Sequence, residues 1–133
     1  GLVGSEMCIR DRSYVGGEVR EATVELSVEG KKQIVDIGDL VSQACELIVP
    51  KIGNAIKRIV AGADPEYQPV LRNNIILSGG GSLIDGIAAR MTDEISDIGD
   101  VTVWCVEDPI NAVANGALQL AGEMPDDMYT AIN

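Results

Sequence analysis

Apolar and polar residues alternate in the first part of the chain that shows a clear pattern. In the segment 19–28, apolar residues recur with a period of two, at Val24, Leu26 and Val28. This period is typical of a half-buried β-strand. Glu29-Gly30-Lys31 supplies turn residues, and the segment 33–37 is again rich in β-branched residues. The pattern therefore predicts a β-hairpin.

The apolar spacing becomes helical at Leu40 and stays so to about Val60. Apolar residues now recur three or four positions apart, at Leu40, Ala44, Leu47, Ile48, Ile52, Ala55, Ile56 and Ile59. Pro50 lies inside this stretch, and because a proline removes a backbone hydrogen bond, we expect the helix to kink or split there. Such a stripe can bind a partner, but packing in a core is its commoner meaning.

The second half of the chain has the order strand, helix, strand, helix. A loop with a short helical turn is expected at 61–69, and the acidic tail from Glu123 is expected to fray. The four elements are a wholly apolar strand at 74–77, a helix at 83–95 with Leu83, Ile87, Met91 and Ile95 on one face, a strand at 101–106, and a helix from Pro109 to about Ala121. A short, wholly apolar strand is typical of a buried parallel sheet. The order predicts an α/β fold with parallel pairing of the two strands.

Residues 1–12 show neither the period of a strand nor that of a helix. The string VGSEMCIRDR resembles translated adaptor sequence that contaminates many metagenomic reading frames. We therefore leave residues 1–12 out of the fold argument and expect the natural chain to begin upstream. Cys8 then belongs to the adaptor-like segment.

The chain is strongly acidic, since its 133 residues contain 10 Lys and Arg against 21 Asp and Glu, a net charge of −11. This charge disfavours nucleic-acid backbones and anionic membrane surfaces as partners. The chain has no His, which excludes a Ser-His-Asp triad, a Cys-His nucleophile and a His-ligated zinc. No apolar run reaches the ~18 residues of a membrane span, and no signal peptide is evident. We expect a cytoplasmic protein with no transmembrane segment.

The cysteines and acidic clusters have simple interpretations. Cys45 and Cys105 lie in apolar segments without a CxxC pair, so we expect small buried side chains in a reducing compartment. Asp93, Glu94 and Asp97 could form a weak divalent-cation site, but a solvated face with an Arg90–Glu94 pair is commoner. Glu107-Asp108 is expected to cap a helix. No residues form an acid–base pair, so we predict no catalytic residue and no metal ligand.

Three glycines, Gly79–Gly81, stand between the apolar strand and the helix predicted after it. Glycines allow a sharp turn and let a ligand approach the backbone without a Cβ in the way. A helix N-terminus suits a phosphate, and ligands of open α/β sheets bind at this edge. The motif is neither a Walker A nor a GxGxxG, and alone it is equally typical of a tight turn without a ligand.

The surrounding residues resemble a known family. The segment 72–91, RNNIILSGGGSLIDGIAARM, and the segment 104–120, WCVEDPINAVANGALQL, resemble the C-terminal part of the bacterial actin-like ATPases. In that family a strand ending in glycines precedes a helix with a further glycine, here Gly86, and a second strand ends in EDP. Residues 86–91 also resemble eukaryotic actin. The resemblance covers essentially residues 14–124 and is greatest to the magnetosome-organising type, with the cell-shape type second.

The resemblance implies a partial actin-like (ribonuclease H-like) ATPase fold, the C-terminal part of its second domain. Residues 13–38 would be a β-hairpin of the peripheral subdomain, 39–122 the α/β core subdomain and 123–133 an acidic tail. The family binds ATP beside the glycine turn, which implies that role for Gly79, Gly80, Gly81, Ser82, Leu83 and Ile84. The resemblance implies that the phosphate-binding hairpins, the acidic residues that hold Mg²⁺ and the base-contacting helix lie upstream. This chain alone is therefore expected neither to hydrolyse ATP nor to bind it tightly.

Three functional hypotheses follow. The first is a fragment of a cytoskeletal protein that binds ATP and self-associates into filaments, with adaptor proteins as further partners. The second is a fragment of a sugar-kinase or chaperone-type ATPase of the same superfamily. The third is an acidic interaction module that binds no nucleotide. The combination of motifs favours the first.

Overall fold

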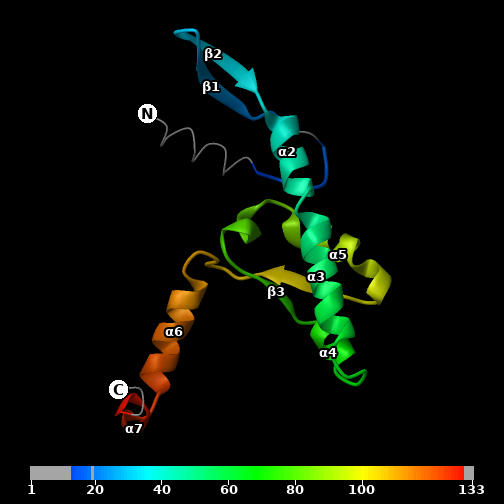
Figure 1. Ribbon diagram of the computed structural model, residues 1–133, viewed down its shortest axis with the longest axis vertical. Coiled ribbons are helices and arrows are strands. Elements are labelled where there is room, and N and C mark those ends of the chain that lie inside the picture. Colours follow the sequence, from blue (N-terminus) through cyan, green and yellow to red (C-terminus); the bar gives the residue numbers. More distant parts are fainter. Residues whose placement is uncertain (1–12, 19, 131–133) are drawn as a thin grey trace.

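The computed structural model describes residues 13–18 and 20–130. Its parts follow one another along the long axis, with the hairpin at one end, an α/β core in the middle and the last two helices at the other end (Figure 1). The interpretation of residues 1–12 lies outside the described residues. No helix within them is long and apolar enough to cross a membrane.

The predicted hairpin is confirmed. Strands β1 (Thr23–Val28) and β2 (Lys31–Asp36) pair antiparallel, with Val28 opposite Lys31. The turn therefore has two residues, Glu29 and Gly30, whose φ angles of 51° and 77° are typical of a type I′ turn. The return strand begins at Lys31, earlier than predicted, because the turn is one residue shorter. Only Val24 is buried; Leu26 and Val28 are almost half exposed, so the expectation of a half-buried strand holds only near its base.

Asp36 closes the base of the hairpin. Its Oδ1 accepts hydrogen bonds from the backbone N–H groups of Ala22 and Gly38, both at 2.9 Å. Gly38 then begins helix α2 (Gly38–Glu46). A Cβ at Gly38 would lie 1.8 Å from the carbonyl oxygen of Arg20, so this crossing requires a glycine.

The long apolar stripe forms two helices, as Pro50 predicts. Helix α2 ends at Glu46, and helix α3 (Val49–Ala61) begins with Pro50 in its first turn. The expected core stripe is partly wrong, because Leu40, Leu47 and Ile59 are 65%, 69% and 70% exposed. The covered side is made by Val41, Cys45, Val49, Ile52, Ile56 and Val60. The helices carry apolar residues on more than one side, and the described residues cover one of them.

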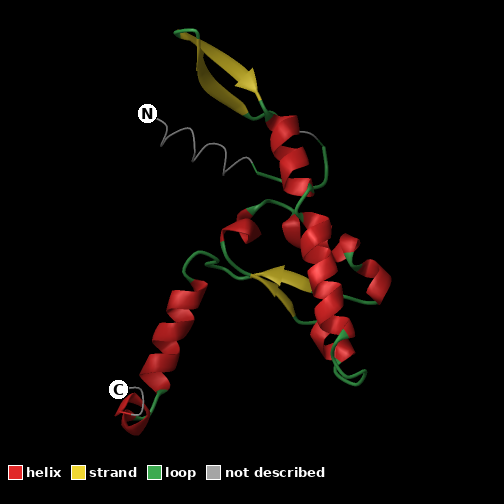
Figure 2. Cartoon of the chain, in the orientation of Figure 1, coloured by secondary structure: helices red, strands yellow, loops and turns green. Residues whose placement is uncertain are grey.

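The two short strands pair in parallel as predicted. Helix α4 (Gln68–Arg72) precedes β3 (Ile75–Leu77), which pairs with β4 (Val103–Cys105). One face of the pair packs on α3 and on helix α5 (Ile87–Glu94) (Figure 2). On the other face, Ile76 and Trp104 are 50% and 46% exposed. The expectation of a fully buried strand is therefore wrong for this chain, since no described residue covers that face.

The helix predicted at 83–95 begins later. A 3₁₀ turn, η1 (Gly80–Leu83), follows the first glycine, and α5 starts only at Ile87. The intervening segment is extended because Tyr14 and Asp85 form a parallel β-bridge, with Val15 N–H donating to Asp85 O at 3.0 Å. Of the four residues expected on one helix face, Ile87, Met91 and Ile95 are buried, whereas Leu83 lies before α5 and is 41% exposed.

The last helix, α6 (Ala112–Glu123), starts three positions after the expected Pro109. Pro109 lies in a preceding turn, in which Asp108 Oδ1 accepts the N–H of Asn111 at 3.3 Å. Asp108 therefore caps a turn rather than the first turn of the helix. The 3₁₀ turn η2 (Ser96–Ile98) follows α5, and a short helix α7 (Asp126–Thr130) occupies the tail that was expected to fray.

Candidate functional site

The glycine turn is closed on itself and fixed to the start of the C-terminal segment. Gly79 has φ 85° and ψ 175°, a region that favours glycine. Its carbonyl oxygen accepts the N–H of Ser82 at 3.1 Å and the hydroxyl of Ser82 at 2.8 Å. Its own N–H donates to Pro109 O at 2.9 Å. The turn is thus held by the EDP segment that follows β4.

The backbone of the turn is open to a ligand. A Cβ placed on Gly79, Gly80 or Gly81 would meet no atom within 4 Å. No described residue accepts a hydrogen bond from the N–H of Gly80 or Gly81. Backbone donors in a concave turn are suited to a phosphate or another anion. These residues therefore fit one side of a nucleotide site.

A depression of about 500 Å³ lies next to the turn. It is lined by Ser82, Leu83, Ile84, Asp85, Gly86, Ile87, Ala88, Ala89 and Cys105. Its volume falls within the ~300–1,000 Å³ typical of small-molecule sites. The structure thus brings together Ser82, Leu83 and Ile84 from the predicted set, while the three glycines adjoin the depression without lining it. The sequence contained no signal for Asp85, Ala88, Ala89 or Cys105.

The rim of the depression carries a fixed carboxylate. Arg20 Nη1 lies 2.5 Å from Asp85 Oδ2, and its guanidinium stacks on the ring of Tyr14 at 4.9 Å from the centroid. The hydrogen bond from Arg20, with its positive charge, holds the pKa of Asp85 below its usual range. The backbone N–H of Arg20 also donates to the Tyr14 hydroxyl at 2.6 Å. The segment before the hairpin therefore reaches the rim.

Further ion pairs involve residues of α3 and α5. Lys57 Nζ lies 2.7 Å from Asp97 and Arg90 Nη1 lies 3.1 Å from Glu94, so the predicted Arg90–Glu94 pair is confirmed. Among the residues that the structure describes, no group of three His, Cys, Asp or Glu side chains could hold a metal ion.

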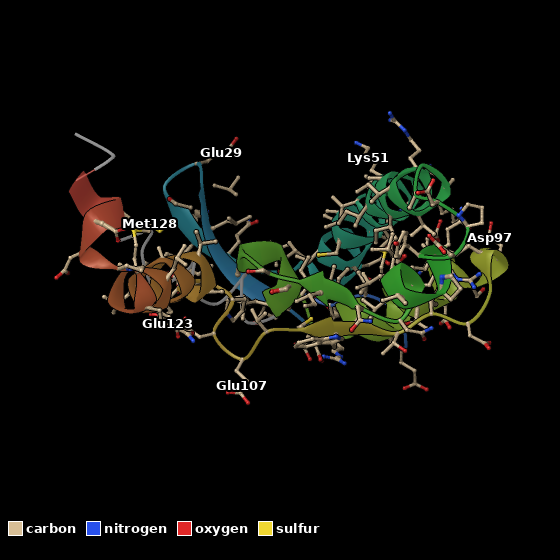
Figure 3. The ribbon with its side chains drawn as sticks, turned by 90° about the horizontal axis from the view of Figure 1, so that it is seen from below. Glu29, Lys51, Asp97, Glu107, Glu123 and Met128 are labelled. Atoms are coloured by element: carbon tan, nitrogen blue, oxygen red, sulfur yellow. The ribbon has the colours of Figure 1, made fainter. Side chains whose placement is uncertain are left out.

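Glu107 points away from the core (Figure 3). Cys45 is buried as expected, but Cys105 is only partly buried, so the expectation of a buried side chain is wrong for it. Its partial burial raises the pKa of the Cys105 thiol.

Solved structures show which class of fold contains this arrangement. The structure titled MamK double helical filament matches with a TM-score of 0.84 and 34% identity over 94% of this chain and 38% of that chain. A non-polymerising MamK mutant bound to AMPPNP matches with a TM-score of 0.79 and 34% identity over 92% of this chain and 38% of that chain. The chain therefore has a partial actin-like fold, that of the bacterial actin-like cytoskeletal proteins.

The sequence comparison identifies the family to which the chain belongs. The family described as MreB/Mbl protein matches residues 6–128, and the chain belongs to this family. The actin-like protein MamK of Magnetospirillum gryphiswaldense is 39% identical over 117 residues, which are 88% of this chain and 32% of that protein. MamK of Paramagnetospirillum magneticum is 38% identical over 117 residues, 88% of this chain and 34% of that protein.

The comparisons confirm the predicted resemblance to MamK. The chain spans about a third of the length of the curated relatives it matches, 32% and 34%. The family match begins at residue 6, inside the segment 1–12 that was interpreted as adaptor-derived. The boundary between that segment and the family sequence therefore stays a prediction.

Proposed function

We propose that this chain supplies one wall of an ATP site and part of a filament subunit in a bacterial actin-like cytoskeletal protein. The observation that carries the ATP assignment is the open glycine turn beside the 500 Å³ depression. The relative solved with AMPPNP, an ATP analogue, supports the assignment. Gly79, Gly80 and Gly81 would offer backbone N–H groups to a phosphate, and Ser82, Leu83 and Ile84 would line the neighbouring surface.

The chain's contribution to ATP chemistry is binding and orientation. No described side chain is assigned a catalytic role. Bound Mg²⁺ would screen the phosphate charge. We infer that the Mg²⁺ ligands lie in the part of the longer protein outside this chain. The chain alone is then expected to bind ATP weakly and not to hydrolyse it.

The assembly is proposed from the relatives. A MamK structure is a double helical filament, which supports self-association of the protein that carries this chain. We infer a cytoplasmic filament, of the magnetosome-organising type rather than the cell-shape type, because the matched relatives are MamK proteins. Adaptor proteins would be further partners.

Polymerisation of the full-length protein tests the proposal. Light scattering should rise when Mg-ATP is added, and Gly80→Asp should abolish ATP binding because its carboxylate would face the phosphates. Gly30→Asp adds the same charge at an open glycine in the hairpin turn and should bind ATP normally. Absence of polymer at every salt concentration would remove the filament assignment. Equal ATP affinity in both variants would place the nucleotide elsewhere, or favour the nucleotide-free interaction module.

A further inference from the structure

Asp85 places a negative charge in the depression beside the glycine turn. Of the described residues that line the depression, Asp85 is the only one with a charged side chain. It follows Gly81, the last glycine of the turn, by four positions. A free carboxylate at this place would repel an anionic ligand that enters the depression. Binding of ATP there is therefore sensitive to whatever neutralises Asp85.

Arg20 supplies the neutralising charge from a distant part of the sequence. Its Nη1 lies 2.5 Å from Asp85 Oδ2, and the two residues are 65 positions apart. Their side chains are 57% and 65% exposed. An ion pair as exposed as this one adds little to the stability of a fold. Its main consequence is local: it cancels the single negative charge on the wall of the depression.

The guanidinium of Arg20 is held in place by a buried aromatic ring. It lies over Tyr14, 4.9 Å from the ring centroid, and the Tyr14 hydroxyl accepts the backbone N–H of Arg20 at 2.6 Å. Tyr14 is 1% exposed and forms the β-bridge to Asp85. One fixed residue therefore sets the position of both partners of the ion pair.

The base of the hairpin also constrains Arg20. A Cβ at Gly38 would lie 1.8 Å from the Arg20 carbonyl oxygen, so the two backbones cross closely. Two positions after Arg20, the N–H of Ala22 donates to Asp36 at 2.9 Å. The location of the Arg20 side chain thus depends on the hairpin, whereas Asp85 belongs to the segment between the glycine turn and α5.

We propose that Arg20 is a positioning residue of the ATP site, which acts through Asp85 by removing the repulsion between that carboxylate and the phosphates. The inference rests on the proposed function, because it needs an anionic ligand in the depression. It adds a residue that lies far from the glycine motif in the sequence. Movement of the hairpin base that separates Arg20 from Asp85 would expose the carboxylate and weaken ATP binding.

Two single substitutions with opposite expected effects test the proposal. ATP affinity of the full-length protein is measured by equilibrium dialysis with Mg²⁺, at low salt and below the protein concentration at which light scattering rises. Arg20→Gln leaves the carboxylate unpaired and should weaken ATP binding about three- to tenfold. Asp85→Asn leaves a positive charge and should bind ATP at least as tightly as the wild type. If the ion pair only stabilised the fold, both substitutions would weaken binding.

Further variants separate charge from shape. The double variant Arg20→Gln with Asp85→Asn carries neither charge and should bind ATP within about twofold of the wild type, and Arg20→Lys should restore most of the affinity lost in Arg20→Gln. Lys32→Gln makes the same charge change in the exposed Lys32–Glu25 pair, 2.7 Å apart, and should bind ATP normally.

Salt gives an independent readout. The Debye length falls from ~10 Å at 0.1 M salt to ~3 Å at 1 M, so the difference in ATP affinity between Arg20→Gln and the wild type should shrink as salt is added. A difference that does not change with salt would contradict an electrostatic role for Arg20.

The outcomes distinguish this inference from the proposed function. Absence of ATP binding by the wild type would overturn both. If the wild type binds ATP, then equal affinity of Arg20→Gln, or a loss in Asp85→Asn as large as that in Arg20→Gln, would overturn the role of Arg20 alone. Should Arg20→Gln fail to fold, Asp85→Asn and the double variant decide: weaker ATP binding by both would overturn the proposal.

Discussion

Arg90 Nε donates to Glu46 Oε2 at 3.0 Å, and this bond joins the middle of α5 to the end of α2. The other carboxylate oxygen of Glu46 accepts the N–H of Gly16 at 3.0 Å. Arg90 also reaches Glu94 one turn further along α5. One carboxylate therefore ties three segments together: the segment before the hairpin, the helix after it, and the helix whose first turn lines the depression.

Glu46→Gln should destabilise the protein. The substitution keeps the shape of the side chain and removes the negative charge that accepts both hydrogen bonds. The Arg90 and Glu46 side chains are 27% and 34% exposed. We expect a loss of about 1–2 kcal/mol in the free energy of unfolding, measured by urea denaturation. Glu25→Gln is the matched control, because the Glu25–Lys32 pair, 2.7 Å apart, lies on the exposed hairpin. Equal changes in the free energy of unfolding for the two substitutions would show that the Glu46 contacts do not stabilise the fold more than an exposed ion pair does.

Gly86→Ala and Gly116→Ala should change stability in opposite directions. Gly86 has φ 78°, and a Cβ there would lie 2.6 Å from Val15 O. We expect a loss of about 1–3 kcal/mol, seen as a lower melting temperature. Gly116 lies inside α6 with open space around it, so alanine should stabilise by roughly 0.5–1 kcal/mol. A neutral Gly86→Ala would mean that residues 13–16 do not hold the segment before α5.

Local sequence patterns were sufficient for the elements whose determinants lie within them. The hairpin turn follows from Glu29-Gly30, and the helix split follows from Pro50. The start of α5 could not be predicted locally, because the extended conformation at Asp85 depends on Tyr14, which is 71 positions away in the sequence. The prediction that the apolar stripe of residues 40–60 packs in the core was partly wrong for a similar reason. When a helix is apolar on several sides, periodicity does not say which side is covered.

The candidate site was predictable in part. The family motif predicts a nucleotide-binding role for the three glycines and for Ser82, Leu83 and Ile84, and this role stays a prediction. The structure places the last three on one depression. Ala88, Ala89 and Cys105 line it because α5 and β4 pack beside the turn, and small apolar residues carry no signal of such a role. The link between Gly79 and Pro109 was also missed, since a backbone hydrogen bond leaves no trace in residue type.

The base of the hairpin should weaken in acid. Hydrogen bonds from the backbone N–H groups of Gly38 and Ala22 lower the pKa of Asp36. A carboxyl with a lowered pKa in the folded state stabilises the fold above its unfolded pKa, about 3.9, and that contribution is lost as the pH falls through the folded value. NMR titration should show Asp36 titrating below about pH 3.9. Asp36→Asn should reduce the loss of hairpin amide protection in acid, and an Asp36 pKa at or above the usual value would contradict the assignment.

Two methionines show which part of this chain has a packed core. Met91 is fully buried, where α5 meets the sheet and α3, whereas Met128 on α7 is 57% exposed. Met91→Ala should lower the free energy of unfolding by about 2–5 kcal/mol, because it removes buried contacts and leaves a cavity. Met128→Ala should have little effect on the chain as it stands, since the side chain is already in water. Calorimetry of both variants separates two possibilities: comparable losses would mean that α7 packs on a surface in solution, and a small loss at Met91 would mean that the core around α5 is not formed.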